Sequence, residues 1–154
     1  MLYISMMEEI KNLFKKMVSY LGLDECSSTV YTTLYFSEKP LTVKEIVDKS
    51  GYSIARVYAS LSILMDINLV EKKRDMGQIV LSANPNFTIL FDNFKKNLMM
   101  NYLKPFSELE EKDKTITTLV YYSKRLYENF LSMIDNNDLL ASIDTEEYAE
   151  KEGR

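Results

Sequence analysis

Apolar residues recur every three or four positions along most of this chain, a spacing that predicts a succession of amphipathic helices. Between residues 42 and 81 the pattern changes. Two short helical patterns meet at Ser50-Gly51-Tyr52, and two short apolar and basic stretches then meet at Asp75-Met76-Gly77. The second pair reads as two strands joined by a tight turn. The sequence therefore predicts a mainly α fold that contains one small β-hairpin.

The first of the two short helices has a clear start. Thr42 stands three residues before Glu45, the spacing of a capping box, in which the two residues satisfy each other's free backbone amides. Gly51 can adopt the positive φ that a tight turn after this helix needs. Because two helices joined by such a short turn cross steeply, the pair predicts a helix-turn-helix.

The second helix, about residues 53–66, begins at Ser53, a good N-cap. Its predicted core side is Ile54, Val57, Tyr58, Leu61, Leu64 and Met65, and its opposite side is Ser53, Ala55, Arg56, Ala59, Ser60 and Ser62. Small side chains with one arginine suit a helix that lies in the major groove of DNA. We expect the base-reading residues to be Ser53, Ala55, Arg56, Ala59 and Ser60. An ordinary solvent-facing helix is the alternative interpretation.

The hairpin, about residues 70–81, carries three consecutive cations next to its turn, Lys72, Lys73 and Arg74. Three adjacent charges cannot be buried, so they indicate a wing that contacts the phosphate backbone. The expected phosphate-binding residues are Thr42, Lys44, Tyr52, Lys72, Lys73 and Arg74. A solvated loop is the alternative for this charge run.

Part of the chain, about residues 20 to 84, resembles the archaeal TrmB-type (MarR-like) regulators. The resemblance is carried by Leu21-Gly22-Leu23-Asp24-Glu25, Val30, Tyr31, Leu34, Ile54-Ala55-Arg56-Val57-Tyr58 and Leu69-Val70-Glu71. It implies a winged helix-turn-helix in a homodimeric transcriptional regulator, with Ser53, Arg56 and Tyr58 on the groove side. In this chain Ile54 and Ala55 replace polar residues that usually follow the cap. At 154 residues, the chain is expected to be a short form without the family's sugar-binding domain.

Long apolar stripes flank the predicted winged helix on both sides. The first lies within residues 1–22, and two more follow residue 85, with Pro105 expected to kink or break the first of these two. Their alternation by threes and fours suits coiled-coil packing between two copies. The expected dimer-interface residues are Phe14, Met17, Phe91, Phe94, Leu98, Leu119, Leu126 and Phe130. Folding of the same stripes onto their own domain is the alternative.

The expected organisation has four segments: an amphipathic helix at 1–22, the DNA-binding domain at 23–84, dimerisation helices at 85–142 and an acidic tail at 143–154. Net charge is −4, but residues 39–82 hold seven basic and five acidic residues, a local charge of +2. Residues 135–154 hold seven acidic and two basic residues, a charge of −5. This end of the chain is expected to be a frayed or disordered, solubilising tail.

Composition argues against an enzyme. The chain has no histidine and one cysteine, so it lacks the commonest general base and the usual transition-metal ligands. No catalytic residue, metal site or cofactor is expected. Cys26, near a predicted helix start, is expected to be a small core residue, and a redox-sensing thiol is the other interpretation. Charged residues interrupt the N-terminal apolar stretch, so no membrane contact and a cytoplasmic location are expected.

The sequence thus predicts a homodimeric, sequence-specific regulator that binds double-stranded DNA. The competing hypothesis is a winged-helix adaptor that binds a protein in a transcription or assembly complex, supported by the acidic net charge and by apolar Ile63 on the outer side of its helix. Activation or repression, the operator sequence and a small-molecule effector are left open by the sequence.

Overall fold

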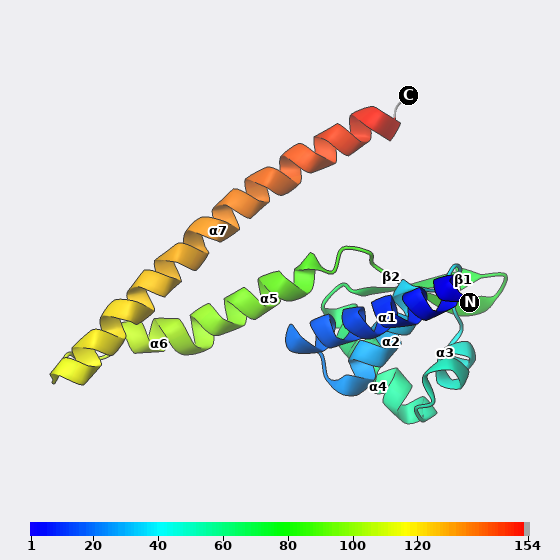
Figure 1. Ribbon diagram of the computed structural model, residues 1–154, viewed down its shortest axis with the longest axis horizontal. Coiled ribbons are helices and arrows are strands. Elements are labelled where there is room, and N and C mark those ends of the chain that lie inside the picture. Colours follow the sequence, from blue (N-terminus) through cyan, green and yellow to red (C-terminus); the bar gives the residue numbers. More distant parts are fainter. Residues whose placement is uncertain (153–154) are drawn as a thin grey trace. The chain divides into compact units, whose positions relative to one another are not determined.

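The computed structural model describes the backbone of residues 1–152 and the side chains of residues 1–133. The chain forms two compact units, Met1–Phe91 and Asp92–Arg154. The predicted mainly α fold with one β-hairpin is confirmed, as Figure 1 shows. The unit boundary lies later than residue 84, because Phe87, Ile89 and Leu90 pack against the core of unit 1.

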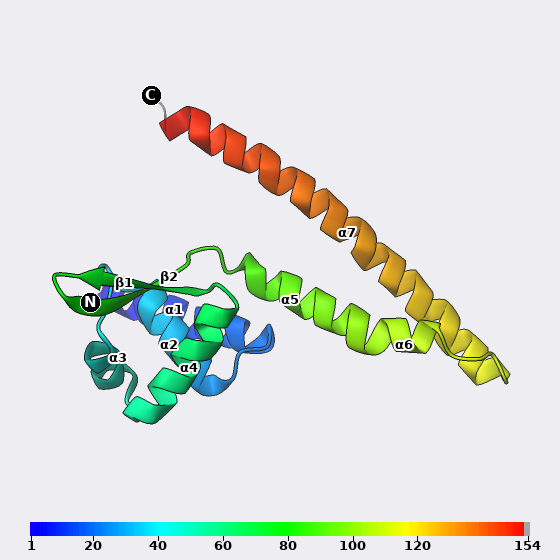
Figure 2. The same ribbon diagram turned by 180° about the vertical axis from the view of Figure 1, so that it is seen from behind.

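Unit 1 contains four helices that precede a two-stranded antiparallel sheet. Helix α1 lies along the side of the unit that is nearest the viewer in Figure 1, and it lies behind α2 in Figure 2. The elements are α1 (Leu2–Tyr20), α2 (Glu25–Tyr35), α3 (Val43–Ser50), α4 (Ile54–Asp66), β1 (Val70–Asp75) and β2 (Gln78–Ala83).

The helix-turn-helix begins and turns where the sequence predicts. The Thr42 hydroxyl accepts a hydrogen bond from the Glu45 amide at 3.2 Å, while the Thr42 amide donates to Glu45 Oε1 at 3.2 Å, so the capping box of α3 is confirmed. Helix α3 ends at Gly51, whose φ is 76°, a left-handed value that costs glycine little. The Ser53 hydroxyl then caps α4 by accepting from the Arg56 amide.

A two-residue turn joins β1 to β2, since Asp75 pairs with Gln78. Met76 and Gly77 have φ values of 50° and 82°. Positive φ at both central residues is the geometry of the type I′ turn, whose twist matches that of the flanking strands. Leu41, just before α3, exchanges backbone hydrogen bonds of 2.9 and 2.8 Å with Leu81 of β2. The hairpin is therefore fixed to the start of the helix-turn-helix.

The core of unit 1 is built from all of its elements. Every element contributes at least one buried side chain, and Cys26 is among them at 5% exposure. The buried set is Val18, Leu23, Cys26, Val30, Tyr31, Leu34, Leu41, Ile46, Val57, Leu61, Leu64, Leu69, Val70, Leu81 and Leu90.

Aromatic side chains fasten α1 and the segment after the hairpin to α2. The ring of Phe14 lies 4.4 Å from that of Tyr35 and 5.8 Å from that of Phe87. The Tyr31 hydroxyl donates to the carbonyl of Asn84 at 2.6 Å, and the Tyr35 hydroxyl donates to that of Pro85 at 3.1 Å. The chain thus leaves unit 1 along a path that α2 holds in place.

Helix α5 (Thr88–Leu98) begins in unit 1 and continues into unit 2, where the π-helix η1 (Met99–Leu103), α6 (Lys104–Ser107) and α7 (Lys114–Glu152) follow. Pro105 has no amide hydrogen to donate, so a regular α-helix cannot continue through it. The structure confirms the predicted interruption, because the π-helix comes just before Pro105 and α6 ends soon after it. Buried side chains of unit 2 include Lys95, Met99, Leu103, Val120 and Ser123.

The backbone of α7 is helical through Glu152, so the expectation of a disordered tail is not met. Residues 114–152 contain no glycine and no proline, and they include leucine, alanine, glutamate and lysine, all good helix formers. The side chains of the predicted acidic tail lie outside the described residues. Within the described part of the chain, we find no helix whose length and apolar content would let it cross a membrane.

Candidate nucleic-acid interface

The exposed side of α4 is a row of small side chains between two larger ones. Ala55, Ala59 and Ser62 lie on the solvent side, with Tyr58 at one margin of this row and Arg56 at the other. Such a helix can approach base edges closely, and its alanines suit contact with thymine methyl groups.

Ser60 does not belong to this surface, which corrects the sequence prediction. Its side chain is only 3% exposed, and it lies on the core side of α4 with Val57, Leu61 and Leu64. The helical spacing explains the difference, because residue 60 is three residues from 57 and four from 64. Ser62, which the sequence placed on the same side, is exposed as predicted.

Ile54 and Tyr58 were assigned to the core side by their spacing, and this part of the prediction is wrong. Both are 56% exposed. Tyr58 instead lines a shallow hollow between α4, the start of α3 and the hairpin, together with Thr42, Val43, Arg74, Gly77, Gln78 and Ile79. The groove-side position inferred for Tyr58 from the family resemblance fits this exposure, whereas its spacing favoured burial.

The three cations of the hairpin lie along β1 and do not share one face. Lys72 and Arg74 oppose Leu81 and Ile79, whereas Lys73 opposes Val80 on the other face. Arg74 lines the hollow that also contains Tyr58. All three cations are exposed, and none has an acidic partner within 4.0 Å among the described side chains. Lys72 and Arg74 are thus the cations on the face that includes the hollow.

Arg56 is oriented by Tyr52. The guanidinium carbon lies 4.7 Å from the centre of the Tyr52 ring, within the range of a cation–π interaction. Tyr52 is half-buried against the core, so its ring is a fixed platform. The carbonyl of Arg56 is 3.8 Å from the thiol of Cys26, which ties α4 to α2. Two residues predicted to bind DNA, Tyr52 and Arg56, are thereby in contact.

At the start of α3, polar groups already have partners inside unit 1. The hydroxyl of Thr42 lies 3.1 Å from Glu45 Oε1, and Lys39 lies 3.6 Å from Glu45 Oε2. The Thr42 amide and hydroxyl, together with Lys39, hold the pKa of the Glu45 carboxyl below its usual range. Thr42 therefore supports the helix, while Lys44 is exposed with its ammonium free to meet a phosphate.

The predicted dimer residues fall into three groups. Phe14 and Met17 pack against the core of unit 1, so the alternative of folding onto their own domain applies to them. Phe91, Phe94, Leu119 and Leu126 are between 37% and 41% exposed. Leu98 and Phe130 are half-buried.

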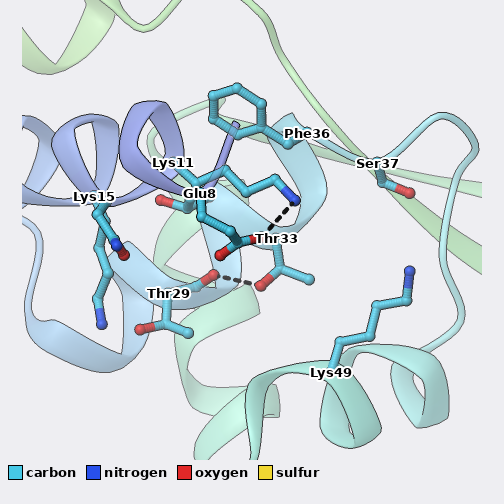
Figure 3. Close-up of a pocket in the computed structure, with 10 residues that line it drawn as sticks. Glu8, Lys11, Lys15, Thr29, Thr33, Phe36, Ser37 and Lys49 are labelled. Atoms are coloured by element: carbon cyan, nitrogen blue, oxygen red, sulfur yellow. Dashed lines mark hydrogen bonds and ion pairs between the residues drawn. The ribbon is translucent and has the colours of Figure 1, made fainter. Parts of the chain in front are cut away.

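Unit 1 also contains a second hollow, drawn in Figure 3, that no sequence motif indicated. It lies between α1, α2 and α3, and its charged lining residues are Glu8, Lys11, Lys15 and Lys49. Glu8 pairs with Lys11 at 3.6 Å. Thr29 and Thr33 of α2 also line it, and their hydroxyls donate to backbone carbonyls of the same helix. Among the residues with described side chains, no three carboxylate or thiol groups gather in a way that could hold a metal ion.

Comparison with protein families gives a match over part of the chain. Residues 18–86 match the family model described as "Sugar-specific transcriptional regulator TrmB". This stretch is the one, about residues 20–84, for which the sequence shows a resemblance to TrmB-type regulators, and it contains the helix-turn-helix and the hairpin. Comparison with curated protein sequences gives no match.

Among solved structures, MepR, a transcription regulator of the Staphylococcus aureus multidrug efflux pump MepA, is 15% identical. The match covers 92% of this chain and 96% of MepR, with a TM-score of 0.44. A MarR family transcription regulator is 12% identical, with 90% of this chain and 87% of the other covered and a TM-score of 0.43. A MarR family regulator from Neisseria meningitidis is 21% identical, with 86% and 94% covered and a TM-score of 0.39.

Proposed function

We propose that this chain is a homodimeric transcriptional regulator that binds specific double-stranded DNA through its TrmB-type winged helix. Helix α4 enters the major groove, and the hairpin lies on the phosphate backbone. Ala55, Arg56, Ala59 and Ser62 read base edges, with Ser53 and Tyr58 beside them. Lys44, Lys72 and Arg74 neutralise phosphates.

The observation that supports this proposal is the shared face of α4 and the hairpin. Arg74 lines the same hollow as Tyr58 and Thr42, so the cationic strand face adjoins the exposed side of α4. A helix in the major groove is flanked by phosphates on either side, and a cation beside that helix is placed to meet one of them. Base-reading groups and phosphate-binding groups therefore adjoin on this surface.

A dimer supplies the affinity that one copy lacks. The local charge of +2 over residues 39–82 is small for a DNA-binding surface, so two copies in consecutive grooves are needed for useful binding. Unit 2 leaves large apolar side chains exposed, among them Tyr102, Phe106, Tyr121 and Tyr122. Exposed apolar residues in this number mark interaction surfaces.

Charge reversal on the hairpin tests DNA binding. Lys72→Glu combined with Arg74→Glu should reduce retention of a selected operator by at least about a hundredfold, because two attractive phosphate contacts per copy become repulsive. Lys112→Glu combined with Lys124→Glu makes the same charge change in unit 2 and should leave retention within about twofold. Binding would be measured by gel shift on sequences selected from genomic DNA. Equal retention by both double variants would contradict the proposal.

A protein-binding adaptor remains the second candidate because α4 exposes Ile54, Tyr58 and Ile63, the last at 45%. Apolar groups on a solvent-facing helix can equally pack against a protein. The hairpin variants separate the two functions, since Lys72→Glu with Arg74→Glu should leave capture of a protein partner intact under this reading. Selection that enriches no DNA sequence would favour the adaptor.

A further inference from the structure

Helix α1 carries a second apolar row, of which Met17 also packs against the core of unit 1 and the other members are exposed. Its members alternate at intervals of three and four residues, the spacing of the a and d positions of a coiled coil. Leu13 is 69% exposed and Tyr20 is 81% exposed, whereas Met17 alone in this row is half-buried. We call this row the α1 stripe: Tyr3, Met6, Ile10, Leu13, Met17 and Tyr20.

The α1 stripe is distinct from the side of α1 that packs on α2. The core-facing residues Phe14 and Leu21 each follow a d position of the stripe by one residue, so the two rows are neighbouring sides of one helix. The stripe spans residues 3–20, about 27 Å at 1.5 Å per residue. Apart from the half-buried Met17, every member of the stripe is at least 42% exposed, which leaves a long apolar surface.

Two charged residues stand beside the stripe, one heptad apart. Glu9 precedes Ile10 and Lys16 precedes Met17, and both are exposed. In coiled coils such flanking charges select the partner and its direction. In a parallel, in-register pair, Glu9 and Lys16 would lie beside Phe14 and Leu21 of the partner subunit, which are apolar and face their own core. A parallel pair therefore gives these charges no partner.

We propose that the occupant of the α1 stripe is the α1 stripe of a second copy, aligned antiparallel. With a two-fold axis between residues 11 and 12, Ile10 meets Leu13 of the partner subunit, Met6 meets Met17 of the partner subunit, and Tyr3 meets Tyr20 of the partner subunit. By symmetry each layer occurs twice. The same alignment places Glu9 beside Lys16 of the partner subunit, so two opposite-charge pairs form without any further adjustment.

This arrangement is self-complementary in both shape and charge. The smaller aliphatic side chains meet at the centre, where packing is tightest, and the tyrosines meet at the ends, where their hydroxyls stay in water. The inference rests on the proposed function only for the homodimer itself. It adds that the DNA-binding units contact each other directly through α1.

Mixed-disulfide formation tests the direction of pairing. Chains carrying Ile10→Cys and Leu13→Cys are purified separately, mixed, allowed to exchange and oxidised. An antiparallel pair should give covalent dimers mainly in the mixture, whereas a parallel pair should link Ile10→Cys chains to one another. The parent chain, whose only cysteine is the buried Cys26, should give no covalent dimer.

Charge exchange tests the pairing without cysteines. Glu9→Lys and Lys16→Glu should each weaken dimerisation about tenfold in sedimentation equilibrium, because attraction becomes repulsion at two places per dimer. The double variant carrying both changes should restore the parent affinity. Asn12→Lys adds a charge to the same helix off the stripe and should leave dimerisation within about twofold.

Disulfide-linked dimers formed by Ile10→Cys chains alone would overturn the inference. It would also be overturned if neither Glu9→Lys nor Lys16→Glu changed the dimerisation affinity. A monomeric parent chain would also overturn it and would mean that the stripe is covered by its own chain. Operator retention, measured separately with the hairpin variants, reports on DNA binding alone. A failed α1 pairing is therefore distinguishable from a failed DNA-binding function.

Discussion

Tyr31 is the residue through which α2 holds the segment that leaves the hairpin. Its side chain is fully buried, and its hydroxyl donates a 2.6 Å hydrogen bond to the Asn84 carbonyl. Tyr31→Phe removes the donor and leaves that carbonyl without it, so unit 1 should lose about 1–2 kcal/mol of unfolding free energy in urea titration. Tyr35→Phe removes an exposed hydrogen bond to Pro85 and should cost less than about 0.5 kcal/mol. Equal losses in the two variants would contradict this account.

The same tyrosine makes unit 1 sensitive to alkali. Burial, and to a lesser extent Tyr35, raises the pKa of Tyr31 above the ordinary tyrosine value of about 10. The folded state therefore holds the phenolic proton more tightly than the unfolded chain does. The stability that the raised Tyr31 pKa gives to the folded state is fully present below about pH 10 and is lost as pH rises above that value. Stability measured from pH 8 to 11.5 should fall at the alkaline end, and Tyr31→Phe should flatten that fall.

Residue type predicted some side-chain positions and missed others for a physical reason. Thr42, Glu45 and Gly51 were predictable because caps and positive-φ turns depend on local chemistry alone. Ser60 was not, because serine is commonly found on a surface, and Tyr58 was not, because its spacing also fits the core side of the helix. The helix phase, fixed by Val57 and Leu64, decides both positions here.

At the scale of elements, the capping box of α3 predicts an acid-sensitive start of the helix-turn-helix. The pKa of Glu45 is lowered, so its contribution to stability is present at neutral pH and is lost as pH falls through the folded-state pKa. Unfolding followed from pH 6 to 3 should show this loss in the parent chain. Glu45→Gln keeps an acceptor at the same position but cannot titrate, so its acid dependence should be shallower. Thr42→Ala removes the cap and should cost about 1 kcal/mol at neutral pH.

The hairpin shows which element properties a sequence conveys. Its turn at Met76-Gly77 and its two strands were predictable from the glycine and the alternating residues. The distribution of its cations also follows from alternation, since Lys73 must oppose the face of Lys72 and Arg74 once the strand is known. The sequence could not indicate that Arg74 and Tyr58 line the same hollow, because that placement depends on the bridge between Leu41 and Leu81.

At the scale of the whole molecule, the exposed cations set a salt dependence. Lys44, Lys72 and Arg74 are the cations of each copy that the proposal assigns to phosphate, so a dimer should show a log-log slope of binding against salt of about −5, at roughly 0.9 per phosphate. Removing one cation per copy with Arg74→Ala should reduce the slope by about 2. Isotherms between low and moderate salt would measure both slopes. A flat isotherm for the parent chain would contradict backbone binding.

Whole-molecule features were the least predictable part. The sequence indicated apolar stripes beside the winged helix, but it did not separate the side of α1 that meets α2 from the side that stays exposed. Phe14 and Met6 look equivalent as apolar residues on one helix, and only the position of α2 assigns Phe14 to the core. Which stripe is used inside a subunit is a property of packing between elements, and periodicity alone does not encode it.

Because Cys26 is buried against the Arg56 carbonyl, the chemical labelling of its thiol can report on the opening of unit 1. A thiol reagent cannot reach the sulfur of Cys26, a residue that is 5% exposed, until α2 and α4 separate, so the rate of labelling measures how often unit 1 opens. Every other position remains free for spectroscopic labels. Operator DNA bound to α4 should slow the labelling of Cys26, and a variant that weakens the packing of α4 should speed it.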